Sequence, residues 1–142
     1  MAKVNISVLF KGNCEEAFNF YKSIFGGEFL SLIRYSDIPS YKGPSEKEKN
    51  KIENVSLALC DNTILMGADV SGPMAKMTNF GNNFSIYLEA ENKEEADKLY
   101  QGLSEGGKIL MPLAIAHWGD YFGMFTDKFG INWQINLSRD KE

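Results

Sequence analysis

The sequence is poor in the residues that most often carry metal binding and catalysis. Among its 142 residues there is one histidine, His117, and there are two cysteines, Cys14 and Cys60. The two cysteines do not have the spacing of a metal site, and they are too few for a disulfide framework. We therefore expect two reduced thiols, as in a cytoplasmic protein, and a restricted choice of chemistry.

The chain also lacks long hydrophobic runs and an excess of positive charge. No apolar stretch approaches the roughly 20 residues of a membrane helix, and the first ten residues do not resemble a secretory signal. The formal net charge is −4 and the basic residues are scattered, which argues against a nucleic-acid or anionic-membrane surface. With 44% hydrophobic and 24% charged residues, we expect one soluble globular domain over residues 1–142.

An internal repeat organises the chain. The stretch that starts at Asn13 returns at Asn92, with an asparagine, two glutamates, an alanine and a tyrosine at one constant offset, and Gly27 and Gly106 match at the same offset. Helix starts often look alike by chance, but the matching flanks favour a duplication. The expected parts are a first module over about residues 1–70, a linker over about 71–82 and a second module over about 83–138.

Each copy of the repeat predicts a helix. Asn13 and Asn92 can cap the helix N-termini, and a glutamate three residues later completes a capping-box pattern. Apolar residues then recur with helical spacing, and paired glycines end each helix. These apolar residues are Cys14, Ala17, Phe18, Tyr21, Ile24 and Phe25 in the first copy and Ala96, Leu99, Tyr100 and Leu103 in the second.

Alternating residues predict a strand before each helix and three strands after it. Alternation indicates a sheet with an apolar face, which takes the helix, and a mixed polar face. Each half is then β-α-β-β-β, which makes the fold class α+β, with a tight turn at Asp61-Asn62. The strands after the helices are expected over residues 28–35, 54–60, 63–69, 108–112, 118–126 and 131–137.

A polar insertion over residues 36–51 interrupts the first module. It ends in the charge run from Glu46 to Lys51. Such runs are usually solvated surface, which is the main interpretation. The alternative is a flap over a pocket.

Several short motifs occur in order along nearly the whole chain. They are Gly12–Ala17, Phe20–Glu28, Leu65–Gly67, Leu103–Lys108, Met111–Leu113, Trp118–Gly119, Phe122–Met124 and Thr126–Trp133. Together with the paired modules, these motifs resemble the PhnB-like branch of the vicinal oxygen chelate superfamily, which includes glyoxalase I, extradiol dioxygenases and bleomycin-resistance proteins.

The resemblance implies that the four strands of each module curl into a cup, that two cups form a cavity, and that a second chain assembles alongside. Exposed sheet edges also favour a homodimer. Some members of the branch carry a label as demethylubiquinone methyltransferases. The sequence does not support that reaction, because it has no glycine-rich turn between a strand and a helix for a nucleotide-type cofactor.

The resemblance also locates the metal positions of the superfamily, on the first and fourth strands of each module. In this chain they fall on Asn5, Met66, Ser85 and Gln134, and a histidine found in many relatives is replaced at or near Asn54. Amide, thioether and hydroxyl groups hold a divalent transition metal poorly. We therefore expect no metal and no other cofactor.

The expected cup lining combines neutral hydrogen-bonding groups with aromatic and methionine side chains. Such a lining suits a small neutral organic molecule, unless the methionines and aromatics merely fill the core. Arg34 is the one cation expected near the cup, or it points to solvent. The expected ligand-binding residues are Asn5, Ser7, Asn54, Met66, Ser85, Tyr87, Trp118, Phe122, Met124 and Gln134.

Three functions remain open on the sequence. The first is a PhnB-like, glyoxalase/bleomycin-resistance-type binding protein with a degenerate metal site. The second is an enzyme of lyase or isomerase type, in which His117 is a general base or a metal is supplied. The third is a regulatory module with a vestigial cup. Cys60 is expected to be buried, whereas Cys14 lies at a helix N-terminus that favours a thiolate and also on the apolar stripe.

Overall fold

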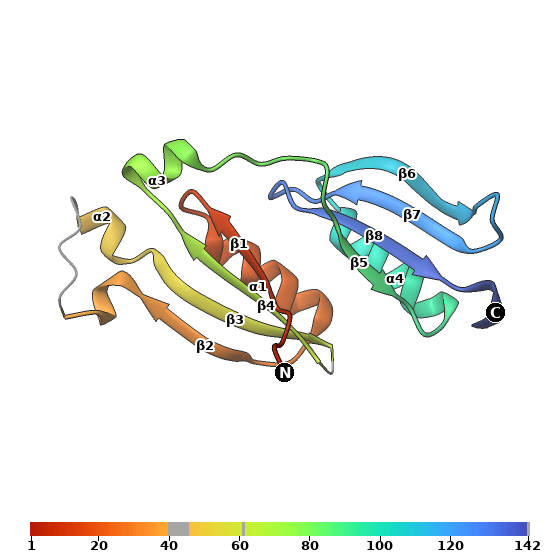
Figure 1. The fold of residues 1–142 in the computed structure, drawn as a ribbon, viewed down its shortest axis with the longest axis horizontal. Helices are drawn as coiled ribbons and strands as arrows, with labels where there is room; N and C mark the ends of the chain where they lie inside the picture. Colours follow the sequence, from red (N-terminus) through yellow and green to blue (C-terminus); the bar gives the residue numbers. More distant parts are fainter. Residues whose placement is uncertain (40–45, 61, 142) are drawn as a thin grey trace. The chain divides into compact units, whose positions relative to one another are not determined.

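The structure is a computed structural model that describes residues 1–39, 46–60 and 62–141. The chain divides into two compact units, Met1–Asn79 and Phe80–Glu142, and each unit is described by itself (Figure 1). The predicted turn at Asp61-Asn62 lies partly outside the described residues. No helix among the described residues is long and apolar enough to cross a membrane.

The first unit is a β-α-β-β-β module, as predicted. The sheet order is β1-β4-β3-β2, with β1 parallel to β4 and the other neighbours antiparallel. The linker expected after the module contains the short helix α3. The elements are β1 (Ile6–Phe10), α1 (Cys14–Phe25), β2 (Phe29–Arg34), a 3-10 turn (Tyr35–Asp37), α2 (Glu46–Lys49), β3 (Ile52–Cys60), β4 (Thr63–Asp69) and α3 (Gly72–Met77).

The second unit repeats this topology. The order β5-β8-β7-β6 again has one parallel pair, β5 with β8. Strand β6 extends beyond the predicted end at residue 112, because Pro112 lies on an edge strand, where a missing N–H is tolerated. The elements are β5 (Ile86–Glu89), α4 (Lys93–Ser104), β6 (Lys108–Ile115), β7 (Tyr121–Thr126), β8 (Asn132–Leu137) and a 3-10 turn (Arg139–Lys141).

Each helix covers one face of its own sheet. Helix α1 packs on β3 and β4, and α4 packs on β6, β7 and β8. The predicted stripe of α1 is buried from Cys14 to Tyr21. Gly67 on β4 lets α1 approach closely, because a Cβ atom at this position would clash with the Phe18 ring. We call the other face of each sheet, which does not carry the helix, the open face.

The N-terminus of α1 is capped differently from the prediction. The Asn13 side chain makes no capping hydrogen bond. The Asp69 carboxylate, at the end of β4, takes its place: Oδ1 accepts from the N–H groups of Gly12 at 2.9 Å and Cys14 at 3.0 Å, and Oδ2 accepts from the N–H of Ile52 at 3.0 Å. The capping prediction is therefore wrong for Asn13.

The prediction is confirmed for α4, where Asn92 Oδ1 accepts from the N–H of Glu95 at 2.8 Å. The Glu95 carboxylate accepts from the N–H of Glu91, one residue before the cap. In the strand pairings Met66 corresponds to Gln134, so the counterpart of Asp69 in this unit is Leu137, whose side chain has no acceptor. The two copies thus satisfy the same helix end by different means.

Candidate functional site

The strand register brings one residue from each strand into a row across the open face of each sheet. In the first unit the row is Ser7, Met66, Ser56 and Ser31. In the second unit it is Tyr87, Gln134, Met124 and Met111. The rows correspond strand by strand, so Ser7 on β1 corresponds to Tyr87 on β5, and Met66 on β4 corresponds to Gln134 on β8.

The open face of the first unit contains most of the candidate residues expected from this half. Asn54 and Met66 are half-buried, and Ser7 is exposed. The Ser31 hydroxyl donates to Asn54 Oδ1 at 3.1 Å, which links β2 to β3. Asn5 precedes β1 and is exposed. The side chains gathered on this face are neutral.

Aromatic and thioether groups dominate the open face of the second unit. The Trp118 ring meets the Phe122 ring edge-on at 5.3 Å between centroids, and His117 meets Trp118 at 4.8 Å. Phe122 is nearly buried, at 8% exposure, whereas Trp118 is 43% exposed. Met124 is half-buried. The turn between β6 and β7 therefore adds the Trp118 indole to this face, where it packs on the Phe122 ring.

The polar candidates of the second unit have different surroundings. Gln134 is half-buried in the middle of the row, and Ser85 lies half-buried just before β5. Tyr87 is 51% exposed, and its hydroxyl donates to Glu89 Oε1 at 3.1 Å. Burial first, and then the charge of Glu89, raise the pKa of Tyr87. His117 is an exposed residue of the turn, and its role as a base stays a prediction.

Two carboxylates lie at one end of this face and are absent from the residues that the sequence predicts for the site. The Asn136 amide donates to Glu89 Oε1 at 3.1 Å and to Asp120 Oδ2 at 3.2 Å. The sequence contains a signal for Glu89, because it follows Tyr87 by two residues on an alternating strand. No sequence pattern indicates Asp120, because only the folded structure brings it from the β6–β7 turn to Asn136.

The donors on the open faces do not fit a catalytic transition metal. Such an ion needs three or four imidazole, thiolate or carboxylate ligands that converge. Within residues 1–39, 46–60 and 62–141, no three histidine, cysteine, aspartate or glutamate side chains are grouped so that they could hold a metal ion. The rows offer hydroxyl, thioether and amide groups instead.

Arg34 does not lie on the open face. Its guanidinium pairs with the Glu15 carboxylate on α1, with Nη1 at 3.0 Å from Oε1, and it also donates to the carbonyl of Asn50. The hydrogen bond that Arg34 donates to Glu15 lowers the pKa of the Glu15 carboxyl. The expectation of a cation near the cup is therefore wrong, because the strand register places Arg34 opposite the buried Ile52.

The two cysteines have different environments. Cys14 is fully buried, and burial raises the pKa of its thiol, with further contributions from Asp69 and Glu15. The helix N-terminus does not activate this thiol, because the Asp69 carboxylate is bound there. Cys60 is exposed, so the prediction of a buried residue is wrong. At the end of β3 it alternates onto the open side, two residues from exposed Ala58.

This difference predicts selective labelling. In native protein, Ellman's reagent should modify one thiol quickly, that of Cys60, and the second only after denaturation. Cys60→Ser should abolish the fast phase, whereas Cys14→Ser should leave it unchanged. Rapid release of two equivalents from native protein would contradict the assignment.

The charge run that ends the insertion lies beside a pocket. Its first four residues form α2, and Lys47, Glu48 and Lys51 line a pocket of ≈ 220 Å³ together with the β1–α1 turn and the end of β4. The described part of the insertion is therefore more than solvated surface. This pocket lies within the first unit.

The chain is similar in sequence and in fold to known proteins. A family profile described as 3-demethylubiquinone-9 3-methyltransferase matches residues 2–136. The chain is 29% identical to Protein YjdN of Escherichia coli (strain K12) over 138 residues, which cover 93% of this chain and 92% of that protein. The crystal structure of protein PA1353 from Pseudomonas aeruginosa is 32% identical, with a TM-score of 0.82 over 97% of this chain and 98% of that one.

Two further solved structures have a similar fold. The PhnB protein from Bacillus cereus, also described as a putative 3-demethylubiquinone-9 3-methyltransferase, is 31% identical, with a TM-score of 0.78 over 96% of this chain and all (100%) of that one. A glyoxalase/bleomycin resistance protein/dioxygenase family enzyme from Burkholderia phytofirmans PsJN shares the fold at 15% identity, with a TM-score of 0.61 over 96% and 98% of the two chains. The chain therefore belongs to the 3-demethylubiquinone-9 3-methyltransferase family, is PhnB-like, and shares its fold with a protein of the glyoxalase/bleomycin resistance/dioxygenase family.

Proposed function

We propose that this protein binds a small neutral organic molecule on the open faces of its sheets, without a metal of its own. The observation that carries the proposal is the neutrality of the two rows. A divalent metal would have weak donors there, and an anionic ligand would have no cation in either row. The eight row residues are Ser7, Ser31, Ser56, Met66, Tyr87, Met111, Met124 and Gln134.

The second unit supplies the larger binding surface. Trp118 and Met111 are 43% and 42% exposed, so they do not simply fill the core. An indole and a thioether offer polarisable contact area to a flat molecule, and the Gln134 amide can both donate and accept a hydrogen bond. The carboxylates of Glu89 and Asp120 at the end of this face would repel an anion.

Methyl transfer is not part of this proposal, although the family name contains it. A methyltransferase needs a methyl donor, and donors of nucleoside type bind at a glycine-rich turn between a strand and a helix. The β1–α1 turn does not fit such a donor, because the Asp69 carboxylate occupies the N–H groups of Gly12 and Cys14. The β5–α4 turn has the sequence Ala90-Glu91-Asn92, without glycine.

The proposal can be tested with a library of neutral flat compounds and the matching carboxylates. Thermal-shift screening followed by calorimetry should find saturable binding among the neutral members. Trp118→Ala should weaken that binding about tenfold, as expected for a lost aromatic contact of about 1.4 kcal/mol. Met74→Ala, an exposed residue of α3, is the control and should change nothing. Preferential binding of the carboxylates, or unchanged affinity in Trp118→Ala, would refute the proposal.

We further propose that the protein is a cytoplasmic homodimer. The exposed apolar residues Ile109, Leu110 and Ile115 lie on the edge strand β6, which is open to pairing or packing. Both cysteines are free thiols, which suits a reducing compartment. Size-exclusion chromatography with light scattering should give twice the 16.0 kDa mass of the chain. A monomer at micromolar concentration would contradict the dimer.

A further inference from the structure

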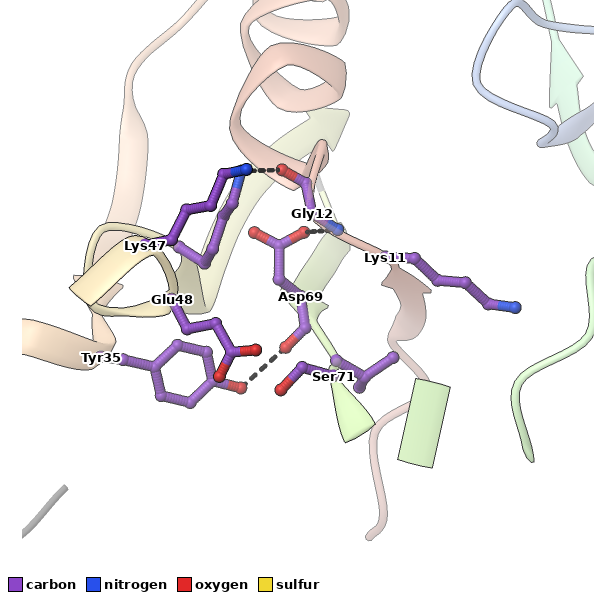
Figure 2. Close-up of a pocket in the computed structure, with 9 residues that line it drawn as sticks. Lys11, Gly12, Tyr35, Lys47, Glu48, Asp69 and Ser71 are labelled. Atoms are coloured by element: carbon purple, nitrogen blue, oxygen red, sulfur yellow. Dashed lines mark hydrogen bonds between the residues drawn. The ribbon is translucent and has the colours of Figure 1, made fainter. Parts of the chain in front are cut away.

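The pocket beside α2 is separate from the open-face rows and has its own chemistry (Figure 2). It shares no residue with either row, and its whole lining belongs to the first unit. Its volume of ≈ 220 Å³ exceeds the roughly 30 Å³ that one water occupies in the liquid. The lining includes Gly12, Tyr35, Glu48, Lys51, Asp69 and Ser71.

Three polar side chains in the pocket wall already have partners inside the protein. The Tyr35 hydroxyl donates to the backbone carbonyl of Asp69 at 2.7 Å, and Lys51 Nζ donates to the carbonyl of Gly12 at 2.8 Å. Both carboxylate oxygens of Asp69 accept backbone N–H groups. These bonds connect the 3-10 turn, the β1–α1 turn and the end of β4, so the wall is formed before any ligand binds.

Glu48 differs from these three side chains. Its Oε2 atom is buried and has no hydrogen-bond partner among the described residues. In Figure 2 the Glu48 carboxylate points toward the Tyr35 hydroxyl and the backbone of Asp69. A buried carboxylate oxygen without a donor is unfavourable, because it has lost water and gained nothing in return. A group inside the pocket would remove this cost if it brought an N–H donor.

We propose that the pocket binds a small organic ammonium compound whose N–H donates to Glu48 Oε2. Other oxygens of the lining can accept from the same ligand group: the carbonyl of Asp69, the oxygen of Tyr35, whose proton is already donated to that carbonyl, and the hydroxyl of Ser71. An ammonium group has only donors, and its positive charge complements that of Glu48. The volume is below the roughly 300 Å³ at which pockets for drug-sized ligands begin, so the ligand has few carbon atoms.

The lysines of the lining do not make this an anion site. Lys51 is held by Gly12, Lys11 extends away from the pocket centre in Figure 2, and Lys47 is exposed. A metal ion does not fit either, because Glu48 belongs to no group of three metal-ligating side chains within the described part of the chain.

The test is an NMR titration of the amide signals with three probes. Propylammonium chloride carries the donor and the charge, tetramethylammonium chloride carries the charge without an N–H, and sodium phosphate is the anion. Propylammonium should produce saturable shifts at Gly12, Glu48 and Ser71, and the other two should not. Glu48→Gln should weaken the affinity about tenfold, the loss expected for a charge-assisted hydrogen bond.

Glu46→Gln is the matched control, because Glu46 lies on the same helix and pairs with Lys49 at 2.7 Å. It should leave the affinity for propylammonium unchanged. Three results would overturn the proposal: no saturable shift, a response to tetramethylammonium or phosphate that equals the response to propylammonium, or unchanged affinity in Glu48→Gln. Trp118→Ala should not affect this titration, so the pocket and the open face are tested separately.

Discussion

Replacing Asp69 with alanine should lower the free energy of unfolding by about 3–4.5 kcal/mol, because three backbone N–H groups lose their acceptor at about 1–1.5 kcal/mol each. The side chain is 3% exposed, and its oxygens hold the N-terminus of α1 and the start of β3. Urea unfolding followed by circular dichroism measures the loss. Hydrogen exchange at the amides of Cys14 and Ile52 should accelerate in the variant.

The asparagines at the two predicted cap positions provide controls for Asp69→Ala. Asn92→Ala removes a real capping bond and should cost about 1 kcal/mol. Asn13→Ala removes none and should stay within about 0.5 kcal/mol of the wild type. If Asn13→Ala cost as much as Asn92→Ala, or if Asp69→Ala were nearly neutral, the assignment of Asp69 as the cap would be wrong.

Replacing Asp127 with alanine should cost a similar amount, about 3–4 kcal/mol. In the β7–β8 turn its Oδ1 accepts from the N–H groups of Phe129 at 2.8 Å and Ile131 at 3.0 Å, and its Oδ2 accepts from Trp133 Nε1 at 2.8 Å. Trp133 is fully buried, so its indole N–H has no access to water as a substitute partner. Urea unfolding monitored by tryptophan fluorescence measures the effect.

Asp127→Asn separates the two parts of this interaction. The remaining carbonyl oxygen can still accept the two turn N–H groups, but the amide NH₂ would face the indole N–H, which is also a donor. The loss should therefore be roughly half of that in Asp127→Ala. Equal losses in the two variants would show that the turn bonds contribute little.

The sequence predicts the fold well because the patterns that indicate its helices and strands are local. Alternation along the strands and helical spacing from Cys14 to Tyr21 fix which face each element buries, and the repeat supports the same topology in both units. The strand register follows from the same pattern. The resemblance places Met66 and Gln134 on the fourth strands of the two modules, and the strand pairings give them equivalent positions.

What the sequence could not predict depends on contacts between distant residues. Asp69, which lies 55 residues after Cys14, caps α1 in place of Asn13. Arg34 points away from the open face and pairs with Glu15 on α1. The pocket beside α2 likewise requires three separate segments to meet. The prediction for Cys60 fails because the alternation of its own strand, not its hydrophobicity, decides which side it faces.

On the proposed function, the open faces bind a neutral ligand and hold no transition metal. Calorimetric titration of metal-free protein with zinc, nickel, manganese and iron(II) ions tests it most directly, with thermal shifts as a second readout. We predict no saturable binding of any of these ions and no change in melting temperature. Saturable binding of one ion per unit that Gln134→Ala or Met66→Ala abolishes would contradict the account.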